Sequence, residues 1–195
     1  MSEYKLALFA HIVGVLALFI AIGIEWMYLR LIRGADTVER LQTWGALSKG
    51  LDKLFPLSTV VIIGSGLYLV QKYWGWDAAW IKLGFGALVI MSIVGPAVNT
   101  RRFHAIGLAV ASTPHGPIPP ALARQVHDTV LLTSVQTLAA LAVGVVYLHI
   151  MKPNLTESLV ALAVAVAAGL LISAYSIMRA GVVQLPVTSA ERQWQ

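Results

Sequence analysis

The stretch LALFAHIVGVLALFIAIGI, residues 6–24, is apolar throughout except for one titratable side chain, His11. A run of about 20 apolar residues matches a hydrocarbon layer roughly 30 Å thick, because an α-helix rises about 1.5 Å per residue. The run is too long for the apolar core of a secretory signal peptide, and its arginines follow it instead of preceding it. We therefore expect a retained first transmembrane helix.

Four more apolar runs follow, at residues 57–70, 78–98, 130–150 and 159–178. The chain is 58% hydrophobic and 12% charged, whereas soluble domains are about 25% charged. These features predict an all-α fold: a polytopic membrane helical bundle with five transmembrane helices in a single domain, residues 1–180. The expected spans cover about residues 5–29, 56–73, 78–100, 128–151 and 156–178, with an interfacial helix at 37–53 and a loose cytoplasmic tail at 181–195.

The basic residues separate onto alternate sides of these five spans. The larger group comprises Arg30, Arg33, Arg40, Lys49, Lys53, Arg101, Arg102, Arg124, Arg179 and Arg192. The smaller group comprises Lys5, Lys72, Lys82 and Lys152. Because Lys and Arg accumulate in the cytoplasmic loops of membrane proteins, the larger group is expected in the cytoplasm. The N-terminus is then outside and the C-terminus inside.

Two connections on the arginine-rich side carry helical signals. In residues 37–53 apolar side chains recur at helical spacing, which is typical of a helix at a membrane surface: Leu41, Trp44, Leu47 and Leu51. The proline-rich segment HGPIPP, residues 115–120, interrupts any helix before it. We expect the next helix to restart near Pro120 and to run to Met151.

Two local signals concern the ends and the course of the spans. Pro96 removes a backbone donor inside the third apolar run, so we expect a kink near Asn99. Asn154 and Glu157 have the three-residue spacing of a reciprocal helix cap, and they precede the last apolar run.

Two histidines lie near the outer edge of the expected bundle. His11 is roughly 9 Å below that edge and His149 roughly 4–5 Å below it, at the helical rise per residue. Ionisable groups within spans are costly, so they are candidate functional residues. Their alternative roles are hydrogen bonding across helices for His11 and a merely interfacial position for His149.

Small residues of three spans occupy the same depth: Gly64, Gly66, Gly84, Gly86 and Gly144. One interpretation is close helix packing, which small residues permit in membranes. The other is a slot for a flat macrocycle, haem b, with imidazole on the iron. Copper is a further candidate metal for paired histidines, although Met151 is the only methionine near them.

A second group of polar residues is expected at the inner edge. Glu25 lies about one and a half helical turns before Arg30, and its candidate partners are Arg101, Arg102 and His127. One interpretation is a structural ion pair that closes the inner end of the bundle. The other is a proton acceptor or a substrate contact.

Several classes of function are excluded, or the sequence motifs that would indicate them are missing. The chain has no cysteine, which excludes disulfides, thiolate catalysis and cysteine-bound metals. It has no H-E-x-x-H, P-loop or G-x-S-x-G motif. Its net charge of +5 matches loops that face anionic lipid, and no basic run with interleaved aromatics indicates nucleic-acid binding.

Three stretches together resemble a known family: FAHIVG at residues 9–14, HGPIPPAL at 115–122 and YLHIMKPNL at 147–155. The pattern, over most of residues 5–175, resembles a bacterial family of predicted integral membrane proteins of unknown function. That family is distantly similar to the copper-resistance D proteins and to the HemJ-type protoporphyrinogen oxidases. Both place a histidine early in the first helix, and in HemJ-type proteins it is implicated in haem binding. The resemblance implies this role for His11 alone.

The sequence thus leaves two classes of function open, with enzymatic activity undecided. The first is an integral protein of the bacterial cytoplasmic membrane that binds haem b or copper through His11, with His149 as a second ligand. The second is a non-catalytic subunit of a larger complex, or a small permease. The expected partners are the lipid bilayer and either other membrane proteins or a second copy of the chain; Ala-rich helix faces permit such docking.

Overall fold

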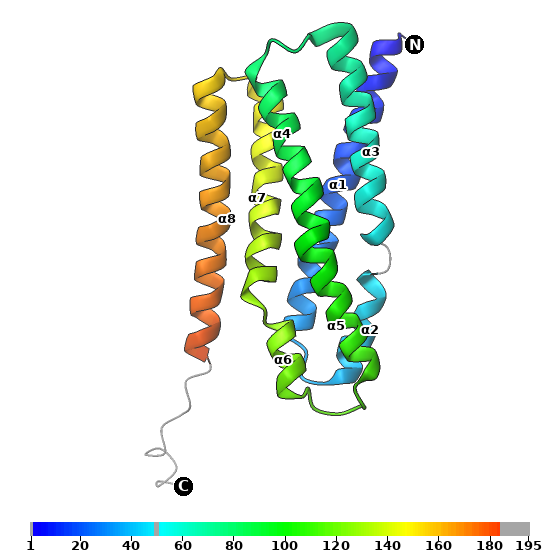
Figure 1. The fold of residues 1–195 in the computed structure, drawn as a ribbon, viewed down its shortest axis with the longest axis vertical. Helices are drawn as coiled ribbons and strands as arrows, with labels where there is room; N and C mark the ends of the chain where they lie inside the picture. The colour runs from blue at the N-terminus through cyan, green and yellow to red at the C-terminus, as the bar shows by residue number, and fades with distance from the viewer. Residues whose placement is uncertain (1, 49–50, 184–195) are drawn as a thin grey trace.

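The computed structural model describes residues 2–48 and 51–183, and all of its elements are helices (Figure 1). They are α1 (Glu3–Arg33), α2 (Val38–Ser48), α3 (Leu51–Leu69), η1 (Val70–Trp74), α4 (Ala79–Val94), η2 (Gly95–Thr100), α5 (Arg101–Ser112), α6 (Pro120–Val126), α7 (Thr129–Met151) and α8 (Leu155–Val183). Five helical stretches are long and apolar enough to cross a membrane. The predicted all-α class and the five candidate spans are confirmed.

The bundle has two distinct ends (Figure 1). The end with the η1–α4 and α7–α8 turns is called the histidine end, because His11 and His149 lie close to it. The opposite end, where α2, α5 and α6 lie, is called the arginine end. α1 packs along α3, and α7 packs along α8 and against α4, so α8 stands at one side of the bundle.

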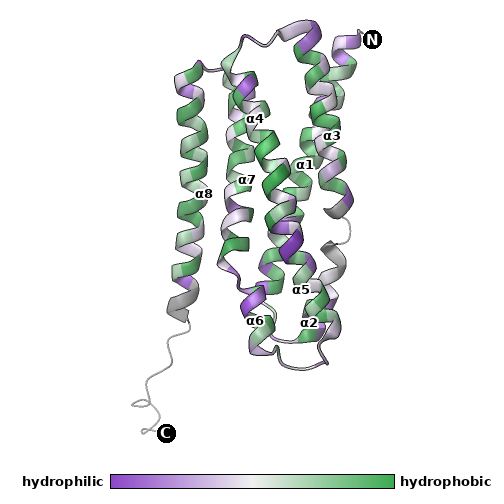
Figure 2. Ribbon diagram, viewed as in Figure 1, coloured by the Kyte–Doolittle hydropathy of each residue, from purple (hydrophilic) through white to green (hydrophobic). Residues whose placement is uncertain are grey.

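The outer surface of the bundle is apolar, as lipid requires. Large hydrophobic side chains on different helices are widely exposed, among them Phe9 (64%), Val60 (67%) and Leu171 (70%). Figure 2 shows hydrophobic colouring along most of α4 and α8, and hydrophilic colouring gathered toward the ends of the bundle. Such an exposed apolar surface is stable only when it contacts hydrocarbon or another apolar surface.

Two helical stretches are longer than a bilayer needs. α1 has 31 residues, and the stretch Ala79–Ser112 is helical over 34, whereas about 20 residues span the hydrocarbon. At the arginine end, the residues of these two stretches that exceed the length of a span pack with α2 and α6 around a separate apolar core. The most buried members of this core include Leu29, Ile32, Val38, Leu41, Ile106 and Val126. The bundle therefore ends in a compact helical cap.

The helix expected at residues 37–53 is correct in type but not in bounds. α2 ends at Ser48, and residues 51–53 already belong to α3. Its apolar face packs on the protein, because Leu41 is fully buried and Trp44 contacts the same core. At these two positions the predicted apolar face therefore packs on the helical cap.

Some expected features fall outside the described residues. Lys49 and Arg192 are among them, and so is most of the expected tail, residues 184–195. The first residues of that expected tail, 181–183, continue α8 instead.

The helix expected from Pro120 to Met151 is interrupted. Asp128 starts a new helix, since its Oδ1 accepts a hydrogen bond from the backbone N–H of Val130 at 2.8 Å. Its Oδ2 accepts from Arg102 Nε at 2.6 Å. The carboxylate thus caps α7 and ties it to α5, which explains the break between α6 and α7.

The other local predictions can also be compared with the structure. Pro96 produces a π-helical segment, η2, through which the helix continues into α5. The cap at the start of α8 is confirmed: Glu157 N–H donates to Asn154 Oδ1 at 3.0 Å, and Asn154 N–H donates to Glu157 Oε2 at 3.2 Å.

Candidate functional site

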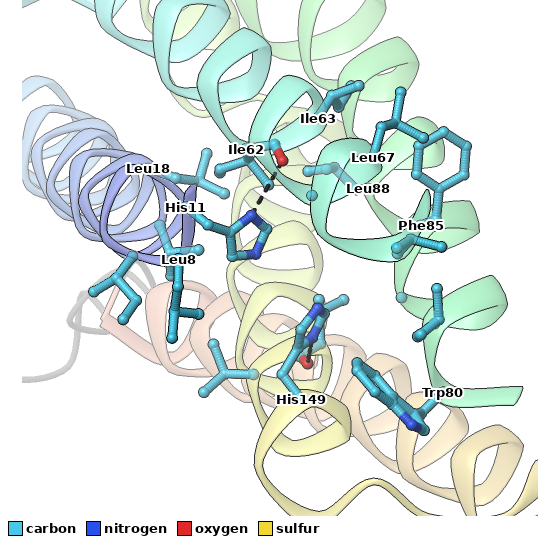
Figure 3. Close-up of a pocket in the computed structure, with 18 of the residues that line it drawn as sticks. Leu8, His11, Leu18, Ile62, Ile63, Leu67, Trp80, Phe85, Leu88 and His149 are labelled. Atoms are coloured by element: carbon cyan, nitrogen blue, oxygen red, sulfur yellow. Dashed lines mark hydrogen bonds between the residues drawn. The ribbon is translucent and has the colours of Figure 1, made fainter. Parts of the chain in front are cut away.

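A cavity of about 470 Å³ lies at the histidine end between α1, α3, α4 and α7 (Figure 3). Cavities that hold cofactors and drug-sized ligands range over about 300–1,000 Å³. Most of the lining side chains are aliphatic or aromatic, and four lining residues carry other polar groups: Tyr4, His11, His149 and Lys152. A mostly apolar cavity with a few polar groups is typical of a binding site for an amphiphilic ligand.

The cavity exists because two helix pairs pack tightly while the space between them does not close. α1 approaches α3 at Gly14, where an added Cβ would lie 2.9 Å from Ile62. α7 approaches α8 at Gly144, where an added Cβ would lie 2.8 Å from Ala165. α1 and α4 barely touch, so side chains from all four cavity helices face a common space.

His11 reaches this space from α1 and is held by α3. Its Nδ1 lies 3.1 Å from the carbonyl oxygen of Ile62 and 3.2 Å from Ser65 Oγ. Because a carbonyl oxygen only accepts hydrogen bonds, Nδ1 is the protonated nitrogen. In the neutral imidazole Nε2 then keeps its lone pair, and the ring is oriented by a neighbouring helix.

His149 reaches the same space from α7 in the same tautomer. Its Nδ1 donates to the carbonyl oxygen of Val145, one turn earlier, at 2.8 Å. Histidines that bind metal ions almost always donate their other ring N–H to a carbonyl or carboxylate, which fixes tautomer and orientation. Both histidines of this cavity have that arrangement.

The two imidazoles are neighbours across the cavity. Their ring centroids are 6.0 Å apart and their planes are inclined by 30°. In Figure 3 the unbonded nitrogen of each ring lies on the side toward the other ring. Two imidazoles that hold one metal ion from opposite sides, each at about 2.0–2.1 Å, have centroids roughly 6 Å apart. The observed separation thus suits one ion between two ligands.

Glycines provide the space for both rings. A Cβ added at Gly66 would lie 3.2 Å from Cε1 of His11, and one at Gly84 would lie 3.1 Å from Cε1 of His149. Gly64 and Gly86, two residues away on the same helices, would meet nothing within 4 Å. Of the predicted glycine band, Gly66 and Gly84 therefore seat the histidines, whereas Gly144 serves helix packing.

Aromatic and basic side chains close the cavity at the histidine end. Trp80 is buried, and its indole meets the His149 ring edge-on, with centroids 5.3 Å apart. Trp74 packs on Trp80 with centroids 5.8 Å apart. The ammonium of Lys152 lies 5.8 Å from the centroid of the Trp80 ring. The Trp80 indole thus contacts both the cation and the imidazole.

The cavity also reaches the lipid-facing surface. Ile12 and Leu16 of α1 line it, and so does Ile150 of α7. These three side chains are 49%, 58% and 69% exposed on the outside of the bundle. The cavity therefore opens sideways between α1 and α7.

In the described part of the chain, Glu25 forms no ion pair with the cations expected at the inner charged site. Glu25 is buried, and its Oε1 accepts a hydrogen bond from Asn99 Nδ2 at 3.1 Å. Arg102 instead pairs with Asp128. Arg101 and His127 are exposed, and no ion pair of Glu25 occurs among the described residues.

The donors available to a metal ion are few. In the described residues no group of three or more His, Asp or Glu side chains could hold a metal ion. The lining therefore offers two imidazoles and no carboxylate. A bare copper ion with more than two protein ligands does not fit this set, whereas haem iron fits, since the macrocycle supplies four of its six ligands.

Sequence reasoning missed Trp80 and Lys152 as cavity residues. A tryptophan near the end of an apolar run is typical of a membrane interface, and Lys152 served only as one of the charges that indicate orientation. One signal was present in the spacing: Trp80 precedes Gly84 by four residues, so both lie on one helix face. Lys152 likewise follows His149 by three residues.

The chain was compared with known proteins in three ways. No family model, no curated protein and no solved structure matches it.

Proposed function

We propose that the protein is a multi-pass membrane protein that binds haem b in the histidine-end cavity, with His11 and His149 as axial ligands. One observation carries the proposal: two imidazoles from different helices, 6.0 Å apart, both direct Nδ1 to a backbone carbonyl and leave Nε2 free inside an apolar cavity. Haem b, when bound, would supply one-electron transfer.

The rest of the chain would position and shield the cofactor. Ile62 and Ser65 hold the His11 ring, while Val145 holds the His149 ring. Aliphatic lining residues such as Leu18, Ile62 and Leu88 are buried and exclude water from the deep part of the cavity. A dry apolar environment and hydrogen bonds to the axial ligands are the means by which a protein sets a haem potential.

The test is optical spectroscopy of the protein purified in mild detergent, as isolated and after adding haemin. We expect a Soret band with the spectrum of a low-spin iron bound by two imidazoles. His11→Ala and His149→Ala should each convert this spectrum to a high-spin form or abolish haem retention. His104→Ala is the matched control, because His104 is exposed on α5 at the arginine end.

Other outcomes would reject the assignment. A colourless preparation that takes up no haemin would exclude haem binding, and stoichiometric copper by elemental analysis would replace haem with copper. An unchanged spectrum in both histidine variants would place any haem elsewhere.

A further inference from the structure

The backbone at Lys152 is unusual for its residue type. Lys152 has φ 49° and ψ 49° at the C-cap of α7, and its N–H donates to the carbonyl oxygen of Leu148 at 2.9 Å. It is the one non-glycine residue with positive φ in the described part of the chain. Glycine or asparagine usually occupies this position, because a Cβ is strained there. The following residue, Pro153, restricts the backbone further.

The side chain of Lys152 gives a reason for a lysine at this position. It lines the cavity at the histidine end, and its ammonium lies 5.8 Å from the centroid of the buried Trp80 ring, which in turn contacts the His149 ring. A glycine would suit the backbone better but would place no charge at this end of the cavity. Backbone strain kept at a cavity is consistent with a role in binding.

The ammonium has no carboxylate partner among the described residues, in which the ion pairs are Arg40–Asp36 and Arg102–Asp128. Two carboxylates of the histidine end are engaged elsewhere. Glu3 accepts from the hydroxyl of Tyr68 at 2.7 Å, and Glu157 caps α8. The positive charge therefore lines an apolar cavity without an ion-pair partner among the described residues, and its one recorded contact is the Trp80 ring.

We propose that Lys152 binds a carboxylate of the cavity ligand. The inference rests on the proposed function, and it assigns a haem propionate to Lys152 while His11 and His149 hold the iron. The preferred ligand class is then a flat, apolar molecule with an acidic edge at the histidine end. A charge-assisted hydrogen bond from an ammonium to a carboxylate is among the stronger polar contacts in proteins.

The experiment separates this contact from iron ligation by using a porphyrin without iron. Protoporphyrin IX carries two carboxylates, and its dimethyl ester carries none. Fluorescence titration of the purified full chain with each compound should show that the diacid binds about tenfold or more tightly than the diester. Lys152→Met should abolish this preference, and Lys152→Arg should keep it.

Two further variants serve as controls. Lys82→Met removes an exposed lysine of α4 that does not line the cavity, and it should bind both porphyrins as the natural chain does. Lys152→Gly removes the charge while relaxing the backbone, so its loss of preference cannot be attributed to failed folding.

The outcomes distinguish this inference from the proposed function. A Lys152-dependent preference together with no two-imidazole haem spectrum would support the acidic subsite and reject haem ligation. A two-imidazole spectrum with a preference unaffected by Lys152→Met would overturn the subsite alone and leave Lys152 to bind lipid headgroups. Failure to bind either porphyrin would overturn the subsite, whereas iron ligation is decided by the haemin spectrum alone.

Discussion

Gly66 and Gly84 have no side chains, and the space that this leaves determines where the two histidine rings can lie. Since an added Cβ would lie 3.2 or 3.1 Å from an imidazole carbon, either ring would have to move by a few tenths of an ångström. Metal ligation is sensitive to shifts of this size, because ligand distances and directions are narrowly defined.

We therefore expect Gly66→Ala and Gly84→Ala to weaken haem retention about 10–100-fold, the range found when groups that orient metal ligands are changed. Gly64→Ala and Gly86→Ala are the matched controls, since their methyl groups would enter open space. Haem-transfer titrations on the four variants measure the effect. Equal losses at all four positions would show that the glycines serve the helices and not the rings.

Lys152 allows a prediction about stability at the same scale. A non-glycine residue in the left-handed region costs roughly 1–2 kcal/mol, so Lys152→Gly should stabilise the fold by about 1 kcal/mol even though it impairs the acidic subsite. Thermal unfolding of the ligand-free protein in detergent measures this change. A lower midpoint than that of the natural chain would show that the lysine itself stabilises the turn.

Individual residues also show how far sequence reasoning extends. His11 and His149 could be selected because ionisable side chains in apolar runs are costly wherever the helices pack. Trp80 could not, since a tryptophan near a membrane interface is common and its contact with His149 depends on how α4 meets α7. Glu25 was expected either to pair with a cation or to accept a proton, and the structure shows the amide of Asn99 as a hydrogen-bond donor to it.

At the scale of elements, the irregular helical segment η2 positions a buried polar contact. Pro96 lacks the N–H that the α-helical pattern needs, and the chain responds with a π-helical turn from Gly95 to Thr100. Within this turn Asn99 is buried and its amide donates to Glu25, while its Oδ1 has no protein partner. The irregular segment thus joins α1 to the α4–α5 helix inside the bundle.

The contact predicts different effects for two substitutions of Glu25. Glu25→Ala leaves the buried Asn99 amide unpaired and should lower the unfolding free energy by about 1–3 kcal/mol. Glu25→Gln keeps an acceptor and adds a donor for Asn99 Oδ1, so its stability should equal or exceed that of the natural chain. Unfolding in mixed micelles compares the two. Equal destabilisation by both would mean that the negative charge itself is required.

Sequence reasoning predicted least accurately the elements whose ends and surroundings depend on contacts between helices. The amphipathic pattern of α2 is the same whether lipid or α5 covers its apolar face. The break before α7 depends on Asp128 meeting Arg102, which lies on another element. By contrast, the cap formed by Asn154 and Glu157 is local, and its spacing alone predicted it.

At the scale of the whole molecule, hydropathy predicted the fold class and the number of candidate spans, since both follow from the length and spacing of apolar runs. It could not predict the cavity. Lipid-facing and packed surfaces are both apolar, so the pairing of α1 with α3 and of α7 with α8 leaves little trace in composition.

Orientation is a prediction about the molecule as a whole. The distribution of Lys and Arg predicts that the arginine end faces the cytoplasm. Because the chain has no cysteine, single cysteines can report it directly. A membrane-impermeant maleimide should label Thr156→Cys in intact cells and Ser112→Cys only after permeabilisation, since both positions are exposed, at the histidine and arginine ends respectively. The reverse result would invert the bundle.

The sideways opening between α1 and α7 determines which concentration of an apolar compound controls the occupancy of the cavity. Ile12, Leu16 and Ile150 border the cavity and the hydrocarbon at once, so an apolar molecule arrives by partitioning into the membrane first. Occupancy then follows the mole fraction of the compound in the bilayer instead of its concentration in the buffer. Adding compound-free liposomes at constant total compound should empty the cavity as effectively as withdrawing the compound.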